Sequence, residues 1–208
     1  MAAELAAVVL AGGRGSRLGA PKAGLRLGND SLLSKTVGEL KRNFAKIIVV
    51  AAAAQLEQPW LKGLAGVSVV FDPSPYPGPL SALGQGLRAA QASVVFACGC
   101  DLPFLRVELA AGLCALLEPS DQAVAAQVQG RPQPLCAAYR RSDALTAIDA
   151  LLAAKETRLR ALLERLATRW LRESELRALD PELASFFNLN TAEDYLRAQA
   201  VLNRSRPA

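Results

Sequence analysis

Short apolar runs alternate with longer segments of helical periodicity along the first 120 residues of the chain. Runs of four to six residues that are rich in valine and isoleucine and end at glycine, proline or aspartate indicate buried strands. On this basis we predict strands at 5–10, 47–50, 67–71 and 93–97, followed by two more at 123–127 and 135–139.

Segments with apolar residues three or four positions apart predict helices after these strands. The first helix starts at Asp30 or Ser31, either of which can cap it, and runs to about Asn43. The leucines of the arginine-rich segment 165–172 also have helical spacing, so we expect a solvated helix face there. Further helices are predicted at 80–91, 107–117, 142–154, 158–166 and, capped by Thr191, 191–202.

This order of elements predicts a mostly parallel sheet with helices on both faces. We therefore expect a Rossmann-like, three-layer α/β/α sandwich that residues 1–208 form as a single domain. Ligands of such sheets bind outside the carboxyl ends of the strands. Three loops follow predicted strands, and we expect them to meet at that edge: 11–22, 72–79 and 98–103.

The loop after the first strand combines glycines with positive charge, and residues 10–22 read LAGGRGSRLGAPK. Its glycines allow positive φ and let backbone N–H groups approach an anion closely. Arg14, Arg17 and Lys22 add charges that suit a triphosphate. A Walker A loop is excluded because Gly19 does not directly precede the lysine, and the fingerprint G-x-G-x-x-G fails by one position. The motif therefore predicts a triphosphate site of another kind.

The chain contains no histidine, which excludes Ser-His-Asp and Cys-His catalysis and histidine-ligated metals. Its 24 lysines and arginines exceed its 19 acidic residues, for a net charge of +5, but they are dispersed. An anionic small substrate explains this excess as well as nucleic acid does, and we expect neither nucleic acid nor a membrane as partner. Four cysteines without CxxC spacing and no signal peptide predict a reduced, cytoplasmic protein.

A carboxylate, Asp101, follows the fourth predicted strand. Mg²⁺ takes oxygen ligands, usually one or two protein carboxylates together with phosphates. An aspartate that faces a triphosphate loop suits this role, although a turn aspartate before Leu102-Pro103 would occupy the same position. The flanking Cys98 and Cys100 make an incomplete zinc site, so we expect a buried pair of small side chains.

Taken together, these motifs resemble the GT-A-type nucleotidyltransferases, whose signature is LAGG-x-x-x-R-(M/L)-G-x-x-K. Within that group the chain is most similar to the molybdenum cofactor guanylyltransferases, which join GMP to molybdopterin. Three further blocks occur in the order and approximate spacing of that family, and with the loop they cover most of the chain: YPGPL at 76–80, CGCDLP at 98–103 and NLNT at 188–191.

The resemblance implies a GTP-binding enzyme with Mg²⁺ as its metal and molybdopterin as its acceptor. It gives catalytic roles to Arg17, Lys22 and Asp101, of which Asp101 is the metal ligand. It also implies transient contact with proteins that deliver molybdopterin or mature molybdoenzymes. The nucleotide- and acceptor-binding residues that it implies are Leu10, Ala11, Gly12, Gly13, Arg14, Gly15, Lys22, Asp72, Gly78, Asp101, Arg158, Asn188 and Asn190.

Several of these positions keep a second, structural interpretation. Asn188 and Asn190 alternate on an expected strand and so face one side, where they recognise a pterin edge or a phosphate, or else they only shape a turn. Arg158 clamps the acceptor phosphate or is a surface arginine. Asp72 and Gly78 belong to a stiff, proline-rich loop that either borders the nucleobase or only leads into a helix.

Two departures from the family pattern bear on the base. Where the family often has an asparagine at the end of the second strand, this chain has only alanines at 51–54, so backbone groups replace that contact or base selectivity is altered. Pro21 stands where guanylyl enzymes usually carry aspartate, whereas Gly12-Gly13 favours guanine, since the related cytidylyltransferase typically reads LAAG. The alternatives are an enzyme that uses CTP or another phosphorylated acceptor, and a nucleotide-binding regulator without catalysis.

Overall fold

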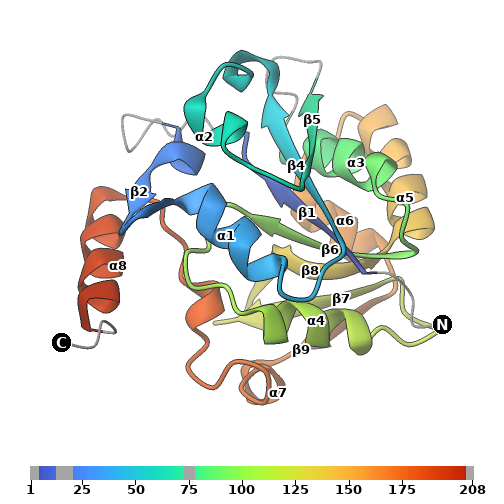
Figure 1. The fold of residues 1–208 in the computed structure, drawn as a ribbon. Coiled ribbons are helices and arrows are strands. Elements are labelled where there is room, and N and C mark those ends of the chain that lie inside the picture. The colour runs from blue at the N-terminus through green and yellow to red at the C-terminus, as the bar shows by residue number, and fades with distance from the viewer. Residues whose placement is uncertain (1–4, 13–20, 73–77, 205–208) are drawn as a thin grey trace.

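The computed structural model describes residues 5–12, 21–72 and 78–204. Its centre is a seven-stranded sheet in the order β5-β4-β1-β6-β8-β7-β9 (Figure 1). All of its strands run in one direction except β8, which is antiparallel to β6 and β7. The bounds are β1 (Ala6–Leu10), β4 (Lys46–Ala52), β5 (Ser68–Asp72), β6 (Val94–Gly99), β7 (Ala123–Val128), β8 (Arg131–Arg140) and β9 (Thr168–Leu171).

Helices cover both faces of the sheet, which confirms the three-layer architecture (Figure 1). The side chains of β1 alternate between the two layers of the core. Ala7 and Val9 face one layer, and Ala6 and Val8 face the other. The first layer contains α1 (Leu32–Leu40), α2 (Pro59–Lys62), α4 (Val107–Ala115) and α7 (Glu173–Leu176). The second contains α3 (Pro79–Ala89), α5 (Arg141–Ala153) and α6 (Leu159–Arg165).

A small hairpin and the C-terminal helix lie together at one end of the molecule (Figure 1). They are β2 (Arg26–Leu27), β3 (Asp30–Ser31) and α8 (Ala192–Arg204). Leu27, Leu32, Leu189 and Ala198 form their own buried cluster. This cluster fixes the segment before α8 against the start of α1.

Apart from the segments 165–172 and 188–190, the strands and helices predicted from the sequence are confirmed with shifts of up to four residues at their ends. Ser31, not Asp30, caps α1, since its side chain accepts a hydrogen bond from the Ser34 amide over 3.1 Å. Thr191 caps α8 in the same way, with its Oγ1 3.1 Å from the Asp194 amide. None of the described helices is long and apolar enough to cross a membrane.

The helix expected across 165–172 is wrong, because β9 occupies residues Thr168–Leu171. This strand pairs in parallel with β7. Trp170 packs against the layer of α3, α5 and α6, while Leu171 is 1% exposed in the opposite layer. Neighbouring side chains of β9 therefore face opposite layers, as in a strand. The helical spacing of the leucines ends with α6 and does not continue into 168–171.

The carboxyl ends of β1, β4, β5 and β6 lie at one edge of the sheet, since these strands are parallel neighbours. The chain adds β4 and β5 on one side of β1 and then crosses to add β6 on the other side. Ligands of open α/β sheets bind at such a reversal of strand order. The three loops expected at this edge therefore do start from it.

Candidate active site

A lysine, an aspartate and an asparagine from distant parts of the sequence meet beside the ends of β1 and β6. Lys22 Nζ donates hydrogen bonds to Asp101 Oδ2 over 3.0 Å and to Asn190 Oδ1 over 2.6 Å. The Lys22 and Asp101 side chains are 21% and 25% exposed, so both remain accessible from solvent. We call Lys22, Asp101 and Asn190 the polar triad.

The local backbone positions Asp101 in this triad. It follows β6 directly, and Gly99 leaves room for its side chain, because a Cβ on Gly99 would lie only 2.4 Å from Asp101 Oδ1. Cys100 N donates to Leu10 O over 3.1 Å, so the turn that carries Asp101 is tied to the end of β1. The carboxylate is therefore held at the point where β1 and β6 diverge.

Asn190 reaches the triad because its segment is tied to both neighbours. The amide of Leu189 donates to the Asp101 carbonyl over 2.9 Å. Asp194 Oδ2 accepts from the amides of Asn190 and Thr191 and from the Thr191 hydroxyl, over 2.8 to 3.0 Å. These bonds, led by the one from the Asn190 amide, lower the pKa of Asp194. The first turn of α8 thus fixes Asn190.

The expected strand through Asn188 and Asn190 is wrong, since residues 187–190 have no regular secondary structure. The two asparagines also have different partners: Asn188 Nδ2 donates to Phe186 O over 3.1 Å, whereas Asn190 joins the triad. The cause is the bond from Leu189 to Asp101, which draws this segment toward a turn rather than along a sheet edge.

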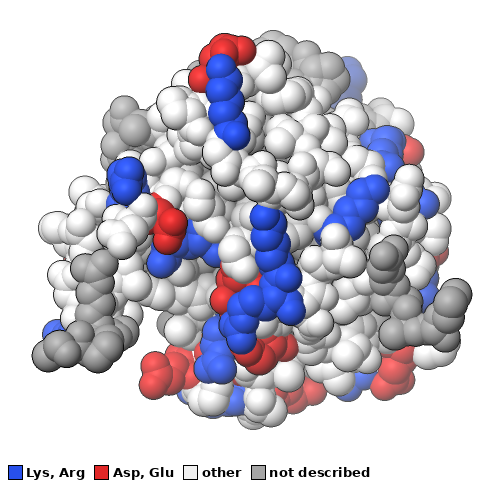
Figure 2. Space-filling view, viewed as in Figure 1, with Lys and Arg blue, Asp and Glu red and all other residues white. Residues whose placement is uncertain are grey.

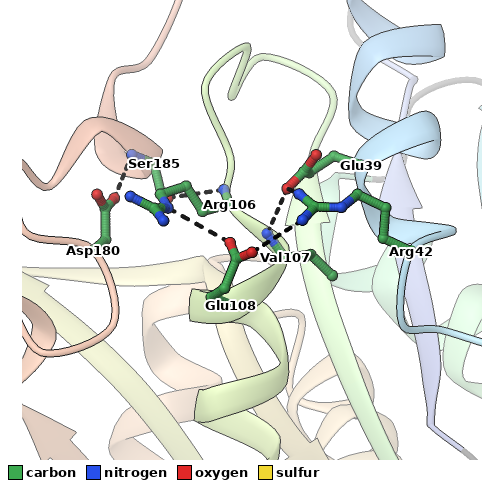
Figure 3. A network of polar contacts seen from close by, with 7 residues as sticks. All are labelled: Glu39, Arg42, Arg106, Val107, Glu108, Asp180 and Ser185. Carbon is green, nitrogen blue, oxygen red and sulfur yellow. Dashed lines mark hydrogen bonds and ion pairs between the residues drawn. The ribbon is translucent and has the colours of Figure 1, made fainter.

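A second connection joins residues 180–185 to the start of α4 (Figure 3). Ser185 Oγ accepts from the Arg106 amide over 3.0 Å, and the Ser185 amide donates to Asp180 Oδ2 over 2.8 Å. Asp180 is fully buried, and among the described residues its Oδ1 has no hydrogen-bond partner. Glu39 bonds the adjacent Val107 amide, which fixes the start of α4. Two bonds therefore join residues 101–106 to residues 185–189: one from Leu189 to Asp101 and one from Arg106 to Ser185.

The beginning of the glycine-rich loop is held between two strand ends. The amide of Ala11 donates to Val50 O over 2.8 Å, and a Cβ on Gly12 would lie 3.3 Å from Ala52 N. Beyond the alanine run at 51–54, the Gln55 side chain turns back and its Oε1 accepts from the Ala52 amide over 3.0 Å. Gly13, Arg14, Gly15 and Arg17 lie outside the described residues.

The proline-rich loop ends against the turn before α6. Asp72 closes β5, with its backbone paired to Ala52, and residues 73–77 lie outside the described part of the chain. Gly78 has a φ of 100°, and a Cβ there would lie 3.3 Å from Thr157 Cβ. Both facts require glycine at the entrance to α3.

Arg158 stands directly before α6, but its guanidinium is not part of the triad. It bonds both carboxylate oxygens of Glu156, each over 3.0 Å. Chiefly through these side-chain bonds, the pKa of Glu156 falls to about 2 and that of Arg158 rises. The Arg158 side chain is 77% exposed, so the pair lies at the surface beside Gly78 and Thr157.

The cysteines take no part in the site. Cys98, Cys100, Cys114 and Cys136 are all buried and free, and burial raises the pKa of Cys100 to about 12. The expectation of buried small side chains beside Asp101 is confirmed. Within the described ranges, no group of three or more acidic, cysteine or histidine residues is arranged to hold a metal ion.

Basic side chains do not form a continuous surface on the face drawn in Figure 2, where they lie in separate groups, several of them against acidic residues. Arg42, for example, bonds Glu39 and Glu108 over 2.6 and 3.1 Å.

The fold and the sequence define a nucleotidyltransferase. Residues 7–170 match the family described as the MobA-like NTP transferase domain. The chain therefore belongs to this family, and the protein is an enzyme of the nucleotidyltransferase type.

Relatives agree with this assignment. Probable molybdenum cofactor guanylyltransferases from Pelotomaculum thermopropionicum and Mycobacterium tuberculosis are 33% and 39% identical to the chain over 199 and 165 residues. These matches cover 96% and 77% of this chain and 94% and 79% of the relatives. The similarity supports a place in molybdenum cofactor biosynthesis.

Among solved structures, the chain is similar to molybdopterin-guanine dinucleotide biosynthesis protein A from Archaeoglobus fulgidus, with a TM-score of 0.83 and 24% identity. That match covers 96% of this chain and 99% of the other. A cytidylyltransferase from Thermus thermophilus, at 18% identity, has a TM-score of 0.71 with coverages of 95% and 98%. Both show the same fold.

Proposed function

We propose that the protein transfers GMP from GTP to molybdopterin, forming the guanine dinucleotide cofactor and releasing pyrophosphate. The polar triad carries this proposal, because it places a cation, a carboxylate and a carboxamide together at the ligand-binding edge of the sheet. The names of the relatives supply the substrate class, since a guanylyltransferase of this cofactor uses GTP and molybdopterin.

Lys22 supplies fixed positive charge where the phosphates of the nucleotide would lie. It follows the glycine-rich loop, and its ammonium is already close to two oxygen ligands. In this position it would stabilise charge on the pyrophosphate as it leaves. Arg14 and Arg17 are proposed to act with it on the strength of the sequence.

The donor set at Asp101 fits Mg²⁺. A single, partly exposed carboxylate with phosphate oxygens as the remaining ligands is a common environment for this ion, and Asp101 Oδ1 occupies the space that the missing Gly99 side chain leaves. Asp101 would hold Mg²⁺, which would supply positive charge toward the phosphates. The triad lysine shares Oδ2, so it holds the carboxylate in one orientation.

The acceptor needs orientation more than activation. A terminal phosphate is already ionised near neutral pH, so its attack on the α-phosphorus requires no strong base, and a chain without histidine meets that requirement. Asn190, beside Lys22, would orient the acceptor. Asn188 and Arg158 are proposed to bind it as well, although Arg158 reaches a phosphate only by leaving Glu156.

A turnover assay tests the proposal directly. The purified protein is mixed with GTP, Mg²⁺ and molybdopterin, and the pyrophosphate released is measured against mixtures that lack one component. We expect release only in the complete mixture, and little when CTP replaces GTP. Tight binding of CTP without binding of GTP would contradict the base assignment, and GTP binding without any turnover would favour a regulator.

A further inference from the structure

The side chain of Gln55 lies at the edge of the sheet where the carboxyl ends of the parallel strands meet, and only its oxygen has a hydrogen-bond partner among the described residues. Gln55 is 6% exposed and lies in the short helix η2 (Ala53–Gln55), just beyond β4. Its Oε1 accepts from the Ala52 amide over 3.0 Å. Nothing among the described residues accepts a hydrogen bond from its Nε2.

The backbone of β4 shows on which side this carboxamide lies. The Val50 carbonyl faces β1, since it accepts from Ala11 N. Alternate residues of a strand turn their amide groups to the same neighbour, so Ala52 N also faces the β1 side, beyond the end of β1. The 3.3 Å between Ala52 N and a Cβ built on Gly12 agrees with this. Gln55 therefore lies beside the start of the glycine-rich loop.

The hydrogen bond also fixes the orientation of the carboxamide. The Ala52 amide is a donor, so the group that it meets must be the oxygen of Gln55. The NH₂ group then has two N–H donors without an acceptor among the described residues. Among the described residues, Asp180 Oδ1 is the only fully buried side-chain nitrogen or oxygen without a partner, so Gln55 Nε2 reaches solvent, where a bound ligand can accept from it.

Building on the proposed function, we infer that Gln55 reads the nucleobase by donating from Nε2 to the carbonyl oxygen at position 6 of guanine. Guanine presents acceptors at O6 and N7, whereas adenine presents a donor at N6 and cytosine a donor at N4. A group that can only donate therefore favours guanine. Gln55 supplies the polar contact that the alanine run at 51–54 lacks.

The substitution Gln55→Glu separates this role from simple capping of η2. A glutamate keeps an oxygen that can accept from the Ala52 amide, but it has no N–H to offer the base. The matched control is Gln58→Glu, which adds the same charge three residues further on. Gln58 makes backbone bonds to Gln55 and Leu61, and its side chain has no hydrogen bond within the described ranges.

The experiment is equilibrium binding by calorimetry, with Mg²⁺, of three triphosphates. GTP has both O6 and a 2-amino group, ITP has O6 alone, and 2-aminopurine riboside triphosphate has the amino group alone. We expect the unaltered protein to bind GTP and ITP about tenfold or more tightly than the 2-aminopurine nucleotide. Gln55→Glu should remove most of that ratio, and Gln58→Glu should keep it.

The ratio is the decisive quantity, because an added negative charge weakens all three triphosphates alike. If Gln55→Glu keeps the preference for GTP and ITP over the 2-aminopurine nucleotide, the inference is overturned while the proposed function stands. If the unaltered protein prefers CTP to GTP in the assay of the proposed function, guanylyl transfer itself is contradicted, whatever the role of Gln55. A loss of the ratio in Gln58→Glu as well would also overturn the assignment to Gln55.

Discussion

Lys22 Nζ donates a hydrogen bond to Asn190 Oδ1 over 2.6 Å, although 168 positions separate the two residues in the sequence. Lys22 ends the loop that the sequence predicts to bind the triphosphate, and Asn190 belongs to the block predicted to bind the acceptor. One side chain therefore contacts both halves of the proposed site. Transfer between two substrates requires such proximity.

Removing the carboxylate of the triad should stop turnover without unfolding the protein. We expect Asp101→Ala to lower kcat by about 100-fold or more, because the proposed metal ligand and the partner of Lys22 are lost together. Pyrophosphate release measures the effect, and circular dichroism checks the fold. Asp149→Ala removes an exposed carboxylate paired with Arg88 and serves as the control. Full turnover by a folded Asp101→Ala would remove this residue from the mechanism.

Asn190→Ala should act mainly on the acceptor. We expect kcat/KM for molybdopterin to fall by about tenfold, as for the loss of one hydrogen bond to a charged group, while GTP affinity changes less. Steady-state kinetics with each substrate varied in turn provides the comparison. Asn203→Ala, an exposed asparagine on α8, is the control. An equal loss for both substrates would assign Asn190 to the nucleotide instead.

A single methyl group at Gly99 should damage the site. A Cβ there would lie 2.4 Å from Asp101 Oδ1, so Gly99→Ala must move the carboxylate, and turnover is expected to fall at least about tenfold. Gly38→Ala adds the same methyl group on α1, where no atom lies within 4 Å. That variant should keep full activity and gain about 0.5–1 kcal/mol of stability. Normal turnover by Gly99→Ala would show that the position of Asp101 is not critical.

Asp194 should make stability depend on acidity. Its pKa is lowered in the folded chain, so its carboxylate stabilises the folded state above the ordinary carboxyl range, and this contribution is lost as pH falls through the folded-state pKa. Urea unfolding of Asp194→Asn should therefore show its largest deficit above about pH 5, and the deficit should shrink only as the pH falls below about 4, through the lowered pKa of the folded state. A deficit that is constant across this range would exclude the electrostatic cause.

Glu156 and Arg158 can be separated by their effects on the acceptor. If Arg158 binds the acceptor phosphate, Glu156→Gln frees the guanidinium and should lower KM for molybdopterin about twofold to fivefold, and Arg158→Ala should raise it about tenfold. Arg160→Ala, on the next exposed arginine, is the control, because Glu164 is its partner. If both variants match the unaltered enzyme, Arg158 does not bind the acceptor.

The sequence predicts most of the layered fold because strand and helix periodicities differ clearly in its first half. The prediction is wrong at β9. Its two apolar residues, Trp170 and Leu171, are adjacent and face opposite layers, so between arginines they give no clear strand pattern. Motif resemblance identifies Lys22, Asp101 and Asn190, yet it does not show that a lysine joins the other two.

Other features of the site depend on three-dimensional contacts that leave no local pattern. Nothing around Gly99 indicates that its missing side chain makes room for a carboxylate two residues later. Gln55 follows four alanines, and only the return of its side chain to Ala52 places it beside the glycine-rich loop. Asn188 and Asn190 alternate like strand residues, but the bond from Leu189 to Asp101 overrides that pattern.

The backbone bond from Leu189 to Asp101 also joins an early segment of the chain to a late one. Ribosomes deliver the chain from its amino end, and domains begin to fold as they emerge. Lys22 and Asp101 both lie in the first half of the chain, with β1, β4, β5 and β6. Residue 190 comes after all seven strands of the sheet, so the bond between Lys22 and Asn190 can form only once the whole sheet has been synthesised.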